Sequence, residues 1–230
     1  MIKQRTNEWF RARIGKFTAS NFSSIVSKPA DKTASISKSA MNCIEKAAAQ
    51  LFYNDYYERR DTDATRWGNT LEKEAIIKFA KKTNLTTKES GFILHPQFPD
   101  IGATPDVIIE DSNFPGKAIV AQIKCPFNVE NHISYTTKIH DTHTLRSKKS
   151  EYFWQVQGEI WISDSIHGYF VSYSPSVSLE NQLHIVEIPR DEVAIAFLKM
   201  KVFEAINIRN VILDEFNSGK RRPKPLESYW

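Results

Sequence analysis

Two short runs of sequence decide the fold: Thr104-Pro105-Asp106-Val107-Ile108-Ile109, and then Ala118-Ile119-Val120-Ala121-Gln122-Ile123-Lys124. Both runs are β-prone, and residues 111–116 between them have the composition of a turn. We therefore predict a hairpin of two strands. Because side chains alternate along a strand, Gln122 and Lys124 share one face, whereas Ile119, Ala121 and Ile123 face the core. The hairpin thus brings Asp106, an amide and an ammonium group together.

The rest of the chain alternates between helical and β-prone segments. Apolar residues at helical spacing predict helices over residues 6–14, 18–26, 35–53, 69–82, 151–162 and 191–216. Further short strands are expected around residues 92–94, 169–171 and 183–186, and residues 128–150 are polar and irregular. This pattern predicts the α/β class, with a central mixed sheet flanked by helices. Without internal repeats or a linker, residues 1–230 are expected to form a single domain.

Composition alone says little about which class of protein this is. Lys and Arg number 31 and Asp and Glu number 27, so the formal net charge of +4 suits a nucleic-acid partner without indicating one. Cys43 and Cys125 are far apart and fit buried thiols in a reducing compartment better than a disulfide or zinc site. No apolar run is long enough to cross a bilayer or resembles a signal peptide. We expect a cytoplasmic protein with no membrane partner.

The residue types at the hairpin suit phosphodiester hydrolysis. Carboxylate oxygens hold Mg²⁺, the metal polarises a phosphate and activates water, and a lysine offsets charge in the transition state. The arrangement resembles the PD-(D/E)xK nucleases. A second Pro-Asp pair stands at residues 99 and 100, but Asp106 is the preferred acid because a strand follows it directly and only a turn separates that strand from its partner.

Five segments resemble, in order and spacing, lambda exonuclease and its relatives in the YqaJ-like viral recombinase family. They are residues 9–15, 18–20, 67–72, 104–106 with 123–127, and 155–157 with Trp161. The resemblance implies a restriction-endonuclease-like fold and a Mg²⁺-dependent 5′→3′ exonuclease of linear double-stranded DNA, with Mn²⁺ able to replace Mg²⁺. Such an enzyme releases 5′-mononucleotides and leaves a 3′ single strand for recombination. The resemblance also implies a phage- or prophage-encoded protein in a bacterial host, a homotrimeric ring and a single-strand annealing protein as partner.

The resemblance also assigns roles to individual residues. Asp106 and the backbone carbonyl of Ile123 are metal ligands, Lys124 is the catalytic lysine, and Glu72 supports the metal or its water. The positions that hold the 5′-phosphate of the digested strand match Arg13, Ser20, Thr104 and Gln157. Guanidinium, hydroxyl and amide groups all donate hydrogen bonds to phosphate. Because Gln155 and Gln157 do not share one helix face well, only Gln157 is assigned to the phosphate.

Gln122 departs from the family pattern. At this position the family has Glu, or less often Asp, and that carboxylate is a catalytic metal ligand. A neutral amide binds Mg²⁺ less well, so we expect a loss of orders of magnitude in rate with DNA binding largely retained. We favour a deliberate inactivating change over a natural variant, and Gln122→Glu is then expected to restore digestion. A second departure is Thr65-Arg66, where relatives have a bulky apolar residue that separates the strands, so no such wedge is assigned.

Simpler interpretations remain open for several of these residues. Asp106 could form a turn, Glu72 and Arg13 could lie on solvated helix faces, and Ser20 could cap a helix. The stretch 140–143, which contains two histidines, is expected to be a mobile loop rather than a metal site, and the basic tail 220–225 is expected to be solvated. Two rival functions also remain: an endonuclease of the same fold, and a catalytically dead DNA-end-binding protein.

Overall fold

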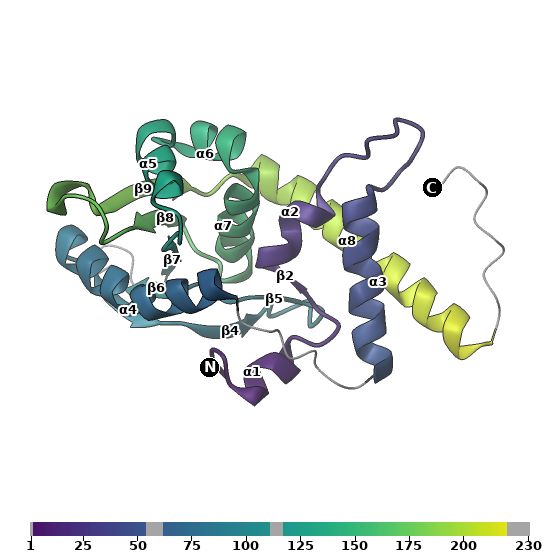
Figure 1. Ribbon diagram of the computed structural model, residues 1–230. Coiled ribbons are helices and arrows are strands. Elements are labelled where there is room, and N and C mark those ends of the chain that lie inside the picture. Colours follow the sequence, from purple (N-terminus) through teal and green to yellow (C-terminus); the bar gives the residue numbers. More distant parts are fainter. Residues whose placement is uncertain (1, 54–61, 111–116, 220–230) are drawn as a thin grey trace.

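The two decisive runs form adjacent antiparallel strands in a computed structural model, which describes residues 2–53, 62–110 and 117–219 (Figure 1). Strand β6 (Val107–Glu110) pairs with β7 (Ala118–Lys124), so that Val107 lies opposite Ala121 and Glu110 opposite Ala118. The predicted pairing of these two strands is therefore confirmed. The turn expected at residues 111–116 lies outside the described residues.

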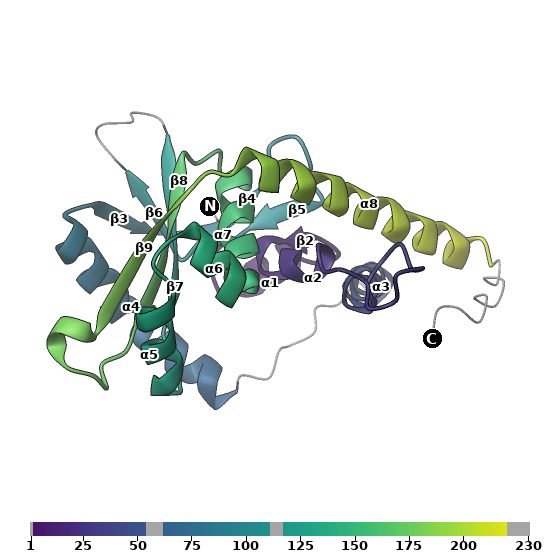
Figure 2. The same ribbon diagram turned by 90° about the horizontal axis from the view of Figure 1, so that it is seen from above.

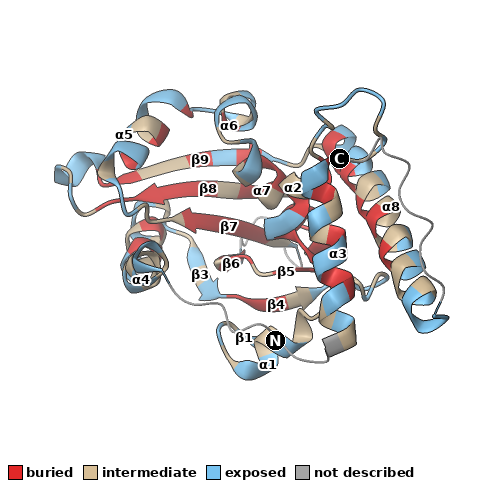
Figure 3. Cartoon of the chain, turned by 45° about the vertical axis from the view of Figure 1, so that its right-hand side comes forward, coloured by how far each residue is buried: buried red, intermediate tan, exposed pale blue. Residues whose placement is uncertain are grey.

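β7 is the central strand of a five-stranded sheet with the order β3-β6-β7-β8-β9. The other members are β3 (Thr86–Glu89), β8 (His167–Tyr173) and β9 (Leu183–Pro189). All neighbours are antiparallel except β7 and β8, which run parallel. Because both faces of β7 are covered, residues 119–123 are all buried (Figure 3).

A four-stranded sheet of shorter strands, in the order β1-β4-β5-β2, forms the second layer. It consists of β1 (Ile2–Lys3), β2 (Phe17–Thr18), β4 (Gly91–Leu94) and β5 (Ile101–Ala103). β2 and β5 are parallel, with Phe17 opposite Ile101 and Thr18 opposite Gly102. Their carboxyl ends therefore lie at the same edge, and Ser20 and Thr104 follow at that edge.

The two faces of the five-stranded sheet are covered by different helices. α7 (Ser150–Ile162) contacts β7 and β8 on one face and also packs against α2 (Phe22–Ile25), so it lies between the two parts of the fold (Figure 1). α4 (Asp63–Thr83) packs on the other face. At Gly158 of α7, an added Cβ would lie 2.4 Å from Cδ2 of Phe22, so this close approach of the two helices requires glycine.

The predicted alternation along β7 is confirmed by the two hydrophobic cores. Ile119, Ala121 and Ile123 belong to the core beneath α4, whereas Val120 belongs to the larger core around α7. Gln122, which has the same parity as Val120, therefore points toward α7 and is only 4% exposed. This packing aims a polar side chain from the middle of the sheet at the polar residues of α7.

Two long helices form the end of the molecule that lies away from the five-stranded sheet. α3 (Lys38–Tyr53) packs against α8 (Glu192–Asn217), which extends along one side of the fold (Figure 2). The short helix α1 (Asn7–Ala12) is capped by the Thr6 side chain, and the 3-10 turn η1 (Ala19–Asn21) precedes α2. None of the helices in the described ranges has the length and apolar character needed to cross a membrane.

The predicted mixed sheet flanked by helices is confirmed, and a second, smaller mixed sheet accompanies it. Another sequence prediction needs correction. The stretch 128–150 is not irregular, because it contains α5 (Val129–Lys138) and α6 (Thr142–Lys148). Asp141 is not in a mobile loop: its side chain accepts a hydrogen bond from the Thr144 backbone in a capping box that starts α6. The basic tail 220–225 lies outside the described residues.

Candidate active site

Asp106 stands at the point where the chain enters β6, with its backbone locked into the hairpin. Its backbone N–H donates to the carbonyl of Ala121 at 3.1 Å. Its Oδ2 accepts hydrogen bonds from the backbone N–H of Ile123, at 2.7 Å, and from the side-chain amide of Gln122. The carboxylate is therefore held directly against the end of β7, as the sequence predicts.

Gln122 continues this hydrogen-bonded chain toward α7. Its Oε1 accepts from Nε2 of Gln155 at 2.6 Å, and the same nitrogen donates to Oε1 of Glu159 at 3.0 Å. Lys124 Nζ donates to Oε1 of Gln155 at 3.4 Å. We call Asp106, Gln122, Lys124, Gln155 and Glu159 the polar cluster; it joins two strands of the hairpin to one face of α7.

Glu159 is a member of the polar cluster that the sequence analysis did not consider, whereas it considered Gln155 and did not assign it to the site. Its side chain is fully buried, at 0% exposure. Its Oε2 is one of only two buried side-chain atoms without a hydrogen-bond partner in the described part of the chain, the other being Nε1 of Trp67. A usable signal was present in the sequence: Gln155 and Glu159 are four residues apart, so they share one face of a helix that is otherwise mostly apolar.

Burial of the Asp106 and Glu159 carboxylates raises the pKa of both groups. Burial raises the pKa of Asp106 to about 7, an effect that Lys124 opposes and the charge of Glu72 reinforces. Burial also raises the pKa of Glu159 well above its ordinary value, and the charge of Asp106 adds to this effect. The charge of Asp106 therefore disfavours the charged form of Glu159, as expected where a cation would be needed to hold both carboxylates ionised.

Glu72 approaches the same region from α4 but is not hydrogen-bonded to the polar cluster. Its Oε2 forms an ion pair with Arg5 at 2.5 Å, and its side chain is 20% exposed. Its charge nevertheless contributes to the raised pKa values of Asp106 and Cys125. Glu72 therefore acts electrostatically on Asp106, while Arg5 holds its carboxylate.

A second group of polar residues lies beside the first, at the edge where β2 and β5 end. Oγ1 of Thr104 accepts hydrogen bonds from Nη1 of Arg13 and from Nε1 of Trp9, both at 3.2 Å. The Arg13 guanidinium carbon lies over the Trp9 ring, 4.1 Å from its centre, which is a favourable cation–π contact. Ser20 follows β2 at the same edge, and its hydroxyl lies 3.1 Å from that of Thr18.

Gln157 does not join either group, and this corrects its assignment to the phosphate. The side chain is fully buried. Its Nε2 donates to the carbonyl of Pro189 at 2.8 Å, and its Oε1 accepts from the backbone N–H of Asp191 at 3.0 Å. Both ends of the amide are thus used to hold the connection between β9 and α8. Of the two glutamines, the structure aims Gln155 at the site.

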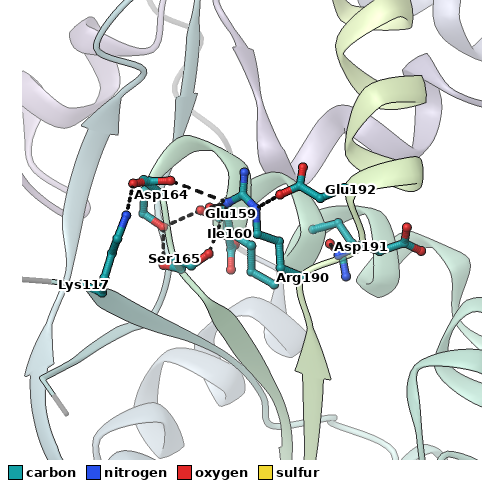
Figure 4. A network of polar contacts seen from close by, with 10 residues as sticks. Lys117, Glu159, Ile160, Asp164, Ser165, Arg190, Asp191 and Glu192 are labelled. Carbon is teal, nitrogen blue, oxygen red and sulfur yellow. Dashed lines mark hydrogen bonds and ion pairs between the residues drawn. The ribbon is translucent and has the colours of Figure 1, made fainter. Parts of the chain in front are cut away.

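The carboxyl end of α7 is held in place by a surface network centred on Arg190 (Figure 4). The Arg190 guanidinium donates to the carbonyls of Ile160 and Ser165, both at 3.2 Å, and pairs with Glu192. Asp164 forms an ion pair with Lys117, which directly precedes β7. These contacts connect the last turn of α7 to both β7 and the β9–α8 connection, so they fix the helix that carries Glu159.

The oxygen atoms of the polar cluster, together with the neighbouring backbone carbonyl of Ile123, are suited to a hard divalent cation. Asp106 and Glu159 offer carboxylate oxygens, Gln122 an amide oxygen and Ile123 a backbone carbonyl, and Mg²⁺ and Mn²⁺ prefer such oxygen ligands. Within residues 2–53, 62–110 and 117–219, no three His, Cys, Asp or Glu side chains gather as a metal-binding group. A cation held here would therefore rely on two acids supplemented by neutral oxygens.

Comparison with solved structures shows that the fold of this chain is similar to that of exonucleases. The alkaline exonuclease LHK-Exo from Laribacter hongkongensis is 26% identical, with a TM-score of 0.76 over 93% of this chain and 97% of that chain. The complex of LHK-Exo with dAMP matches with the same identity and TM-score, over 94% and 99% of the two chains. A phage-related exonuclease from Haemophilus somnus 129PT, at 18% identity and a TM-score of 0.71 over 87% and 96%, shows the shared fold.

The neighbours confirm the predicted restriction-endonuclease-like fold and indicate a DNA nuclease of the alkaline exonuclease type. Among curated proteins, no sequence matches the chain. The family model described as the YqaJ-like viral recombinase domain matches residues 8–165, which is more than half of the chain and includes Arg13, Asp106, Lys124 and Glu159. The chain therefore belongs to the YqaJ-like viral recombinase family.

Proposed function

We propose that this protein is a 5′→3′ exonuclease that digests one strand from the end of linear double-stranded DNA, with Mg²⁺ as cofactor and Mn²⁺ as a substitute. The observation that carries the proposal is the position of two polar groups side by side. Asp106 and Lys124 belong to the polar cluster, and Thr104, which binds Arg13, is only two residues before Asp106. One group suits metal-assisted hydrolysis and the other suits a phosphate.

The residues divide the chemistry between them. A Mg²⁺ ion held by Asp106, the Ile123 carbonyl and the oxygens beside them would polarise the scissile phosphate and acidify the attacking water. Lys124 orients that water and offsets the charge that develops on the phosphate. Gln155 keeps the Lys124 ammonium and the Gln122 amide in fixed positions. Glu72 adds negative potential from the side of α4.

Direction of digestion follows from the phosphate group. The Arg13 guanidinium and the hydroxyls of Ser20 and Thr104 bind the terminal 5′-phosphate, which sets the cut at the first linkage. The product is a 5′-mononucleotide, in keeping with the dAMP complex of LHK-Exo. The remaining 3′ single strand serves recombination, together with a single-strand annealing protein. We further propose a single domain that assembles as a homotrimeric ring in the cytoplasm of a bacterial host.

The test compares linear duplexes that carry a 5′-phosphate or a 5′-hydroxyl with a covalently closed circle of the same sequence. An exonuclease of this kind digests the phosphorylated duplex fastest, releases mononucleotides and leaves the circle intact. Cleavage of the circle, or equal rates on both linear ends, would indicate an endonuclease of the same fold. Asp106→Asn serves as the control for contaminating nucleases. Binding of DNA ends without any cleavage in Mg²⁺ or Mn²⁺ would indicate the catalytically dead alternative, which Gln122 brings into consideration.

A further inference from the structure

The buried carboxylate of Glu159 has no evident purpose in the packing of α7. Its neighbours along the helix, such as Val156 and Ile160, fill the core with apolar side chains. A buried carboxylate that is not paired with a cation or a full set of donors is costly, and protein interiors rarely keep one. Here Oε2 has no partner and Oε1 accepts only the hydrogen bond from Gln155 that the structure describes. Such an orphaned oxygen points to a ligand.

Glu159 lies close to the side chain of Gln122, the position at which the family has an acid and this chain has an amide. Nε2 of Gln155 lies 2.6 Å from Oε1 of Gln122 and 3.0 Å from Oε1 of Glu159, so one nitrogen bridges the two side chains. Gln122 in turn donates to Asp106. The Glu159 carboxylate therefore enters the same polar cluster as Asp106, but from a helix rather than from the neighbouring position of the strand.

The two positive charges of a divalent cation in the polar cluster are matched by carboxylates only if Glu159 is counted. Asp106 and Gln122 alone would give a divalent cation one negative charge, which is the reason the sequence predicts weak activity. Asp106 and Glu159 together give two, and Lys124 remains available for the phosphate and the water. Ligand charge largely determines the affinity of an oxygen site for a divalent cation.

We propose that Glu159 supplies the second acidic metal ligand that Gln122 does not, so the metal site of this chain is built from the hairpin and α7 together. The metal ligands are Asp106, the Ile123 carbonyl and Glu159, and Gln122 with Gln155 holds the two carboxylates in place. This inference rests on the proposed nuclease function. It also replaces the expectation that Gln122 leaves the chain impaired, because the chain as written has its full complement of acids.

The test measures Mn²⁺ binding by calorimetry or electron paramagnetic resonance, and digestion of 5′-phosphorylated duplex in parallel. Glu159→Gln is expected to weaken Mn²⁺ binding by about tenfold or more and to lower the rate by orders of magnitude. Glu151→Gln makes the same chemical change at a half-exposed position of the same helix, where the only ion pair described is with Lys149, and is expected to change neither. The double variant Gln122→Glu/Glu159→Gln is expected to regain metal binding, because the acid then returns to the strand.

A second measurement keeps the proposal testable if Glu159→Gln does not fold. The single change Gln122→Glu in the otherwise unaltered chain is expected to leave the rate within about threefold, since two acids are already present. A gain of orders of magnitude from Gln122→Glu would overturn the proposal, as would unchanged Mn²⁺ binding in folded Glu159→Gln.

Failure of the two proposals can be told apart. If Asp106→Asn abolishes digestion but Glu159→Gln does not, the nuclease function stands and the role of Glu159 is wrong. If Mn²⁺ binding depends on Glu159 but no DNA end is digested, the metal site stands and the nuclease function is wrong.

Discussion

Gln155 and Gln157 are two residues apart on α7 and make contacts on opposite sides of it: Gln155 bonds to Gln122, Lys124 and Glu159, whereas Gln157 bonds to Pro189 and Asp191. Gln155 therefore belongs to the candidate active site, whereas Gln157 stabilises the fold. Their different partners lead to opposite expectations for the same substitution.

Gln157→Ala is expected to lower the free energy of unfolding by about 1–3 kcal/mol, because it removes a buried amide that bonds to the Pro189 carbonyl and to the Asp191 N–H, both in part-buried hydrogen bonds. The folded fraction should still digest DNA at the normal rate. Gln155→Ala is expected to lower the single-turnover rate by about 10- to 100-fold with a smaller effect on stability. Urea unfolding and rapid-quench digestion measure the two effects, and the reverse outcome would return Gln157 to the site.

Stability of the metal-free protein should fall as the pH rises. Burial raises the pKa of Asp106 from 3.8 to about 7, so the folded protein holds this proton more tightly than the unfolded chain does. The resulting stabilisation is complete below the unfolded value and is lost as the pH rises through the folded value. Asp106→Asn should therefore stabilise the metal-free protein at pH values above about 7, by an amount on the order of 2 kcal/mol.

Thermal unfolding in EDTA across this pH range checks the prediction. Saturating Mg²⁺ should stabilise the unaltered chain at high pH, because it binds the folded state, and should stabilise Asp106→Asn much less. A variant that is less stable than the unaltered chain at every pH would show that the Asp106 charge is already compensated.

Arg13 should control the preference for a phosphorylated end. Arg13→Ala removes the guanidinium that bonds to Thr104 and stacks on Trp9, so the rate on 5′-phosphorylated duplex should fall toward the rate on the 5′-hydroxyl form. Arg13→Lys should recover little, because a lysine cannot reproduce the planar fork. Initial rates on the two substrates give the ratio directly, and an unchanged ratio would place the phosphate elsewhere.

Lys124 should affect the chemical step more than binding. Lys124→Gln is expected to lower the rate by about 10²–10³-fold while duplex binding, measured in Ca²⁺, changes little. Lys117→Gln is the matched control, because Lys117 lies at the other end of β7 and pairs with Asp164 on the surface. Equal losses in the two variants would argue for a general effect of charge on DNA binding.

The pairing of the two hairpin strands and the alternation of side chains along β7 could be predicted from the sequence because alternation and a turn are local signals. The same is true of α7 and α8, which have long apolar patterns. β2 and β5 could not be predicted, since two or three residues carry no period and both strands exist only through their pairing. Glu159 was missed for a different reason: which face of a helix meets the sheet is a property of packing, although its four-residue spacing from Gln155 is visible in the sequence.

The link from β5 of the four-stranded sheet to β6 of the five-stranded sheet consists of residues 104–106. Thr104, at its first position, belongs to the group that we propose holds the end of the DNA, and Asp106, at its last, belongs to the group that cuts. Pro105 between them has a fixed φ and stiffens the link. Under the proposed function, this three-residue link is a molecular ruler, and its length sets how many nucleotides are removed in each cycle.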